Sequence, residues 1–181
     1  MDLNVHPVKE FLILVMGPIF QTLAYYILLF LSIDLYKTKM IHYGILCFNL
    51  LPIYPLDGGK LLNIILNNFF PFQKTFQLSI IISYIVTVLV LIQNKKVSIN
   101  MILTYIVLIW LIRKEENKKI IYYKKFLLER LLKNFPHKKN IIIEKENDFY
   151  RYRNNWMKEG NHLIKEKDYL KRKYEFFGKK Y

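Results

Sequence analysis

One carboxylate, Asp57, stands in a stretch of the sequence that otherwise reads as membrane-buried. An ionisable residue inside a membrane segment costs roughly 2.5–3.5 kcal/mol on insertion scales, so by default it marks a functional site. Prolines and a Gly-Gly pair surround it and would interrupt a helix, which is tolerated at membrane depth only where the backbone is buried in protein or lines a polar cavity. The alternative is structural, with Asp57 as a helix N-cap or as part of an Asp-Gly turn. The other residues of this motif are Asn49, Pro52, Pro55, Gly58 and Gly59.

A catalytic zinc site needs three protein ligands and an open position for water. Asp57 can be one of these ligands. The four histidines are His6, His42, His137 and His162, and no two of them have the i, i+4 spacing of an H-E-x-x-H helix. Each is better explained as a polar surface or interface residue. The sequence therefore predicts no complete catalytic site, and no general base, in this chain alone.

Long uncharged runs predict the elements that position Asp57. Phe11–Ile33 and Thr75–Asn94 contain no charged residue and are long enough to cross a bilayer. Ile41–Leu56 and Val97–Ile112 are shorter uncharged runs, and beside two clear spans we interpret them as membrane segments too. We therefore expect an all-α polytopic membrane protein over residues 1–112, with four transmembrane segments. One segment is broken at Asp57, and a turn at 94–96 joins the last two.

Residues 113–181 form a strongly basic tail. They hold 21 of the 28 Lys and Arg residues and 10 of the 14 acids. The positive-inside bias places such a tail in the cytoplasm. With four spans, the N-terminus would be cytoplasmic as well, so we expect a multi-pass protein of the cell membrane with both termini inside.

The tail predicts a small α+β unit. Apolar residues between Ile120 and Phe135 fall roughly at helical spacing among Lys and Arg, which is typical of a basic amphipathic helix on the inner membrane surface. Residues 141–144 and 149–153 read as two strands, 162–164 as a third strand and 166–177 as a terminal helix. Acids are interspersed among the basic and aromatic residues, so anionic lipid is the favoured partner and nucleic acid is disfavoured.

A second motif lies in the first apolar run. Gly17 and Pro18 occur in its first third, where the proline should kink the helix or mark the start of its regular part. Gln21 follows one turn later and should hydrogen-bond to a neighbouring helix.

Together these motifs resemble a known family. The segment LLPIYPLDGGK resembles the Asn-Pro-x-Asp-Gly region of the site-2 zinc intramembrane metalloproteases, and its form is close to their sporulation branch, the stage IV sporulation protein FB type. The lead-in HPVKEFLILVMGPIFQ is similar to the segment that enters the third span in that branch. The resemblance covers about residues 1–66. Tyr54 departs from it, because it stands where the general motif has Asn.

The resemblance implies a function and a cofactor. In the family, the Asp is the third zinc ligand beside two His of an H-E-x-x-H helix, whose Glu activates the zinc-bound water. Asp57 matches that Asp, whereas the His pair and the Glu have no counterpart here. The implied activity is regulated intramembrane proteolysis of a membrane-associated protein such as a pro-sigma factor in sporulation, with a regulatory membrane partner.

Three interpretations stay open. The chain is the C-terminal part of a zinc protease whose H-E-x-x-H span lies upstream, inactive by itself, through a misplaced start or a split gene. Alternatively, it is a non-catalytic membrane scaffold that descends from such an enzyme. A small transporter that uses Asp57 as an ion relay would require further charges inside the spans, and none occurs there.

Overall fold

The computed structural model describes residues 3–4, 6–31, 35–93, 98–135, 137 and 139–178. They divide into two compact units. The helical unit comprises Pro7–Ile64 and Leu78–Glu116, and the tail unit comprises Met1–His6, Ile65–Gln77 and Asn117–Tyr181. The N-terminal segment thus belongs to the same unit as the basic tail.

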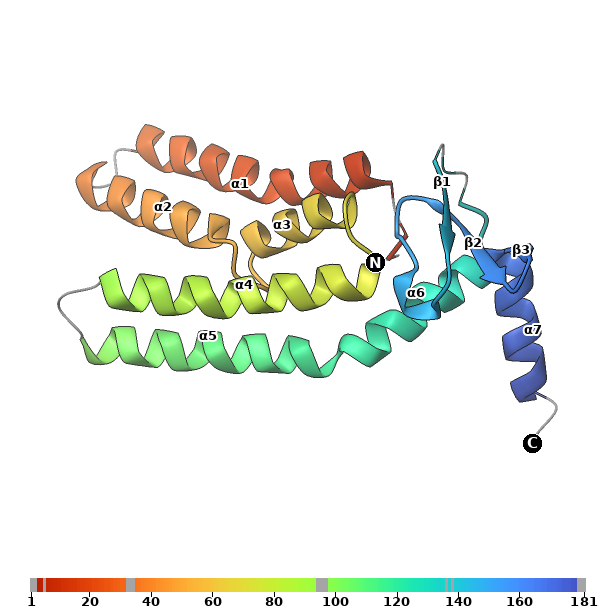
Figure 1. Cartoon of the computed structure of the whole chain (residues 1–181). Coiled ribbons are helices and arrows are strands. Elements are labelled where there is room, and N and C mark those ends of the chain that lie inside the picture. The colour runs from red at the N-terminus through yellow and green to blue at the C-terminus, as the bar shows by residue number, and fades with distance from the viewer. Residues whose placement is uncertain are drawn as a thin grey trace. The chain divides into compact units, whose positions relative to one another are not determined.

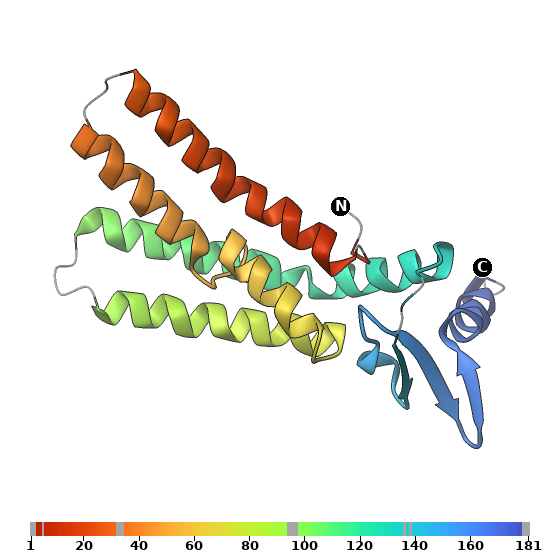
Figure 2. The ribbon, with the colours of Figure 1, turned by 90° about the horizontal axis from the view of Figure 1, so that it is seen from above.

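The helical unit is built from five helices. They are α1 (Pro7–Phe30), α2 (Leu35–Leu50), α3 (Asp57–Asn67), α4 (Phe72–Gln93) and α5 (Ile99–Asn117), and the ends of the last three extend into the tail unit. In Figures 1 and 2, α1 and α2 lie side by side, and α4 and α5 form a second antiparallel pair. The turn expected at 94–96 between α4 and α5 lies outside the described residues.

Two described helices, α1 and α4, are long and apolar enough to cross a membrane. The expectation of four spans is therefore wrong. Helix α2 has only 16 residues, and Lys37 and Lys39 lie within its first turns. Helix α5 ends in a charged segment from Arg113 to Glu116, which leaves too short an apolar stretch. The two runs of 16 uncharged residues were too short for length alone to decide whether they cross a membrane. The helices α2 and α5, in which most of their residues lie, also contain charged residues.

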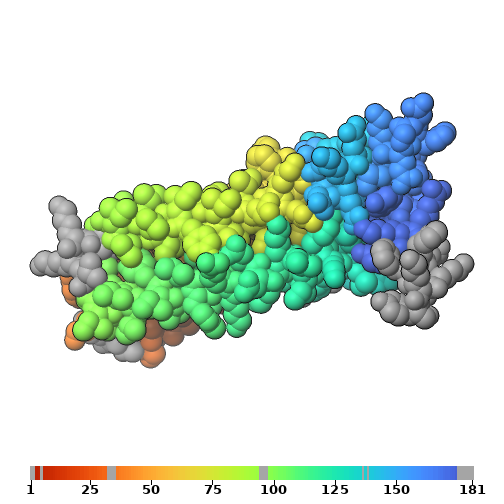
Figure 3. Space-filling model, turned by 60° about the horizontal axis from the view of Figure 1, so that its bottom comes forward, coloured from red at the N-terminus to blue at the C-terminus, as the bar shows by residue number. Residues whose placement is uncertain are grey.

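Large apolar side chains remain exposed along the helices of this unit. No residue of α1 is buried, and Phe20, Leu23 and Ile27 are each more than half exposed. The outward side chains of α4 and α5 form the green surface of Figure 3. Ile85 and Val107 are 53% exposed on that pair of helices. An apolar surface of this kind is typical of helices that contact lipid or other helices.

The tail unit is an α+β unit around one hydrophobic core. Strands β1 (Asn140–Ile143), β2 (Asn154–Glu159) and β3 (His162–Lys165) form a sheet in the order β1-β2-β3. β1 pairs with β2 in parallel, and β2 pairs with β3 as an antiparallel hairpin. Helices α6 (Lys119–Leu132) and α7 (Glu166–Gly178) complete the unit, and Figure 2 shows α7 beside the hairpin.

The core forms where α6 meets the sheet and the start of α4. Phe72 and Phe126 stack with ring centroids 4.5 Å apart, and the buried cluster around them includes Leu127, Phe149 and Leu170. The apolar side of α6 is therefore largely inside the protein. Ile121, Leu128 and Leu132 remain exposed on α6, together with Lys124 and Lys125.

The third strand and the terminal helix are confirmed as β3 and α7. The second strand was predicted wrongly over 149–153. The observed strand begins at Asn154, and Phe149 is instead a fully buried core residue in the preceding loop.

Candidate functional site

Asp57 is the first residue of α3, directly after an irregular segment that separates α2 from α3. Within this segment Ile53 N donates to Leu51 O at 2.7 Å, and Leu56 N donates to Ile53 O at 2.8 Å. The Tyr54–Pro55 peptide bond is cis. The helix break predicted from the prolines is thus present, and it places a carboxylate at a helix N-terminus, where negative charge is favourable.

The Gly-Gly pair allows the segment to fold back on the start of α3. A Cβ on Gly58 would lie 2.2 Å from Leu50 O, and one on Gly59 would lie 2.5 Å from Tyr54 N. Real Cβ atoms do not approach backbone that closely. Both positions therefore require glycine for close packing of backbone against backbone.

Helix α4 holds the segment in place through hydroxyl groups. Tyr54 N donates to Ser83 Oγ at 2.7 Å, and that hydroxyl in turn donates to Ser79 O at 2.7 Å. Asn63 Nδ2 of α3 donates to Ser79 Oγ at 3.1 Å. Ser79 and Ser83 are almost completely buried. These two serines fix the orientation of the Asp57 segment, and no feature of the sequence marked them as part of the site.

Gly17 of α1 lies against the Asp57 carboxylate. A Cβ on Gly17 would be 3.3 Å from Asp57 Oδ2. The other oxygen, Oδ1, accepts a bond from Lys60 Nζ at 3.2 Å, one turn along α3. The Asp57 side chain is 28% exposed. The two motifs, forty residues apart in the sequence, therefore meet at this carboxylate.

The neighbouring motif residues have structural roles. Helix α1 continues through Pro18, whose carbonyl accepts a bond from Thr22 Oγ1 at 2.8 Å. Gln21 Nε2 donates to His42 O at 3.1 Å, so it makes the expected interhelical hydrogen bond, here between α1 and α2. Asn49 lies in the last turn of α2, and Pro52 lies in the segment that follows.

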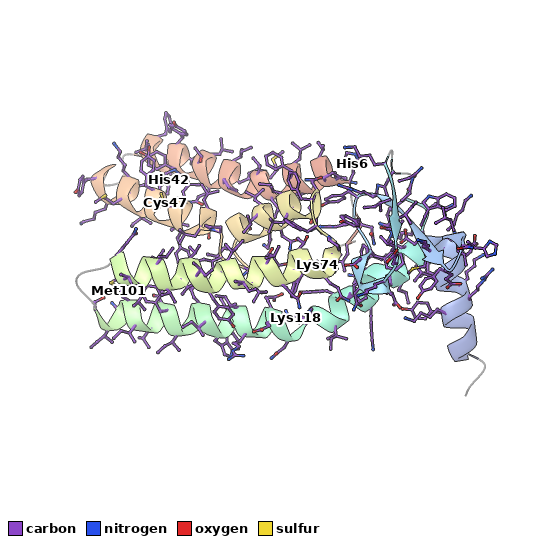
Figure 4. All side chains as sticks on the ribbon, in the orientation of Figure 1. His6, His42, Cys47, Lys74, Met101 and Lys118 are labelled. Carbon is purple, nitrogen blue, oxygen red and sulfur yellow. The ribbon has the colours of Figure 1, made fainter. Side chains whose placement is uncertain are left out.

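Two other possible metal ligands of the helical unit, His42 and Cys47, lie on α2, the helix before the Asp57 segment. His42 is buried and stacks on Tyr25 with ring centroids 4.4 Å apart, and Cys47 is exposed. Figure 4 labels both on α2. Among the described residues, no group of three His, Cys, Asp or Glu side chains is close enough to hold a metal ion. Asp57 offers one ligand, so these residues do not by themselves fit a three-ligand zinc site.

No protein-family model matches the sequence, and no curated protein matches it either. The resemblance to the site-2 family therefore rests on the motifs themselves.

Proposed function

We propose that this chain supplies the aspartate ligand of a zinc-dependent intramembrane metalloprotease of the site-2 type, in its sporulation branch. The observation that carries this proposal is the contact between Gly17 and Asp57. The resemblance rests on a Gly-Pro motif and an Asp-Gly motif in separate segments, and the fold brings the two together at the Asp57 carboxylate.

The local geometry suits a ligand role. Asp57 is fixed as the first residue of α3, and Oδ2, the oxygen that Lys60 does not bind, faces Gly17, which has no side chain. Zinc accepts a carboxylate oxygen at about 2.0–2.2 Å. When bound, zinc would activate water for peptide hydrolysis. The residues of this chain would orient the carboxylate, while two His ligands and the general-base Glu would come from a segment outside the chain described here.

Membrane association agrees with this proposal, because α1 and α4 are long and apolar enough to span a bilayer. We further propose that both termini are cytoplasmic. In support, Leu3 N donates to Glu129 Oε2 at 2.7 Å, so the N-terminal segment is bound to the basic tail unit. The positive-inside bias assigns that unit to the cytoplasm. Ile121, Leu128 and the neighbouring lysines of α6 offer a surface for anionic lipid.

The second candidate function is a non-catalytic membrane scaffold derived from such an enzyme. The Asp57–Lys60 ion pair favours it, because the carboxylate already has a cationic partner within its own helix. In this case Asp57 serves as a charged first residue of α3 and binds no metal.

One substitution separates the two functions. Asp57→Asn keeps the shape and the N-terminal hydrogen-bonding capacity of the side chain but weakens it as a zinc ligand. The chain would be co-expressed with a membrane segment that carries H-E-x-x-H. Bound zinc and cleavage of a membrane-tethered substrate would then be measured, with membrane accumulation as the folding control.

If the protease proposal is right, the unchanged chain co-expressed with the H-E-x-x-H segment should bind zinc and cleave the substrate. Asp57→Asn should accumulate normally in the membrane but lose most of the bound zinc and most of the cleavage. Lys60→Gln is the matched control, because it removes the ion pair but leaves the ligand, and it should keep activity. Full cleavage and zinc content in Asp57→Asn would favour the scaffold. The same conclusion would follow if the unchanged chain with the H-E-x-x-H segment showed neither zinc binding nor cleavage.

A further inference from the structure

The tail unit contains a cavity of about 330 Å³ at the point where α6 ends and α7 begins. This volume lies at the lower end of the range for small-molecule sites. The walls come from the last turn of α6, from the sheet and from the first turn of α7. All of these residues belong to the tail unit, so the cavity is independent of Asp57.

Positive charge dominates the lining of this cavity. Three lysines come from three different elements: Lys133 directly follows α6, Lys165 ends β3, and Lys167 lies in the first turn of α7. Arg130 and one carboxylate, that of Glu166, also line the cavity. Lysines gathered from separate elements in one concave site favour a multiply charged anion.

The single carboxylate is already paired with a buried cation. Arg130 Nη2 donates to Glu166 Oε2 at 2.9 Å, and Arg130 Nε donates to the other carboxylate oxygen. Asn155 Nδ2 also donates to Glu166 Oε2, at 3.0 Å. Because Arg130 neutralises Glu166, the three lysines determine the net charge that a ligand would meet.

Neutral hydrogen-bonding groups and a ring complete the site. Asn154 is fixed by bonds of its Nδ2 to His137 O at 2.7 Å and to Asn140 Oδ1 at 2.9 Å. Trp156 lines the same cavity, with Lys165 Nζ 5.7 Å from its ring centroid. The first turn of α7, a helix of 13 residues, adds the partial positive charge of a helix N-terminus.

We propose that this cavity binds a phosphate-bearing anion, which Lys133, Lys165 and Lys167 hold beside Trp156. Lysine ammonium groups and a helix N-terminus are the usual protein partners of phosphate oxygens. The phosphate comes from one of two sources, a soluble phosphate compound or the headgroup of an anionic lipid. Both present the same charged group to the lysines.

The fluorescence emission of Trp156 can report whether an anion binds in the cavity. The chain contains two tryptophans, Trp110 and Trp156, so Trp110→Phe leaves Trp156 as the single indole reporter. Binding of an anion to Lys165 should change the emission of the neighbouring indole. The full chain in a neutral detergent would be titrated with inorganic pyrophosphate. The Trp156 emission of the chain would also be compared between nanodiscs of pure phosphatidylcholine and nanodiscs that contain phosphatidylglycerol as well.

The test variant is the double substitution Lys165→Gln/Lys167→Gln. The matched control is Lys171→Gln/Arg172→Gln, which removes the same charge from exposed positions of α7 outside the cavity. The affinity derived from the saturable emission change should fall at least about tenfold in the cavity variant, roughly 1.4 kcal/mol of binding free energy. The control variant should keep the affinity of the unchanged chain. Circular dichroism would verify that both variants are folded.

The pattern of responses identifies the source. Saturation by pyrophosphate in detergent indicates a soluble phosphate, whereas a response only to phosphatidylglycerol indicates a lipid headgroup; either supports the site. Equal weakening in both double variants would overturn the proposal, because it would reduce binding to nonspecific charge. The absence of a saturable response to both probes would overturn it as well.

Discussion

Gly17 of α1 and Asp57 of α3 meet so closely that a Cβ on Gly17 would lie 3.3 Å from Asp57 Oδ2. Such a contact is tighter than most real Cβ contacts, so one of the two groups would have to shift by a few tenths of an ångström. The absence of a side chain at position 17 thus determines where this carboxylate oxygen can lie.

Gly17→Ala should therefore move Asp57 without unfolding the chain. In the zinc-loaded complex with an H-E-x-x-H segment, we expect at least a roughly tenfold loss of proteolysis, because small displacements of catalytic groups have large effects on rate. Gly44→Ala is the matched control. It lies within α2 with nothing within 4 Å of the added Cβ, and it should stabilise the helix by up to about 1 kcal/mol. Equal activity in the two variants would contradict the proposed role of the contact.

Gly58→Ala should have a different effect, because the added Cβ would overlap backbone atoms. It would lie 2.2 Å from Leu50 O and 2.4 Å from Leu51 O. Backbone cannot move aside as a flexible side chain can, so we expect a loss of more than about 2 kcal/mol in the free energy of unfolding. Thermal unfolding in detergent would measure it, again with Gly44→Ala beside it. An unchanged midpoint would mean that the segment does not pack as described.

The contrast between these glycines shows what the sequence could predict about the site. Pro52 and Pro55 predicted the break before Asp57, because each of them disfavours continued helix. The Gly-Gly pair was expected to interrupt the helix as well, but Gly58 and Gly59 lie inside α3. No residue chemistry predicted that Gly17 faces the carboxylate, since that contact depends on how α1 packs. Ser83 was missed for the same reason: its hydroxyl becomes important only when α4 meets Tyr54 N.

The tail unit shows the same limit. β3 and α7 were predicted from the local sequence over 162–164 and 166–177. β2 was predicted too early because Phe149–Arg153 contains aromatic residues that favour strands, whereas the observed strand starts with two asparagines. Asn155 is placed there by its bonds to Tyr150 O in the preceding loop and to Glu166 Oε2 in the first turn of α7. The lysine cavity could not be predicted either, because its cations come from three elements.

Arg130 should be the residue on which the tail unit depends most. Its guanidinium is buried and donates to Glu166, to Arg151 O at 2.9 Å and to Arg153 O at 2.6 Å. Arg130→Lys keeps the charge but cannot make these bonds together, so buried acceptors lose their donors. We expect a loss of about 2–4 kcal/mol in the free energy of unfolding.

Arg172→Lys is the matched control for that experiment. Arg172 is exposed on α7, and its replacement should change stability by less than about 0.5 kcal/mol. Near-UV circular dichroism during denaturant unfolding would follow the aromatic core of the tail unit. Similar unfolding curves for the two variants would show that the Arg130 network contributes little.

The last prediction concerns acid and His137. Burial, together with the positive charges of Arg130 and His6, lowers the pKa of His137 from 6.5 to about 4. The Nε2 atom of His137 is buried and has no hydrogen-bond partner among the described residues. A proton added there would therefore lie in an unfavourable environment.

The direction in which stability changes with pH depends on where His137 binds its proton in the folded and in the unfolded chain. Above pH 6.5 His137 is neutral in the folded and the unfolded chain, so it does not change stability with pH. Between pH 6.5 and about 4 the unfolded chain binds a proton that the folded chain does not, so stability falls as the pH falls. Below about pH 4 both states are protonated, and this contribution becomes constant.

His137→Gln should flatten the decline of the unfolding midpoint between pH 6.5 and 4, because glutamine does not titrate. His162→Gln, at an exposed position on β3, should leave the decline as it is in the parent chain. Thermal unfolding at half-unit pH intervals would compare the three proteins. A decline of the same size in His137→Gln would show that His137 does not cause the acid sensitivity.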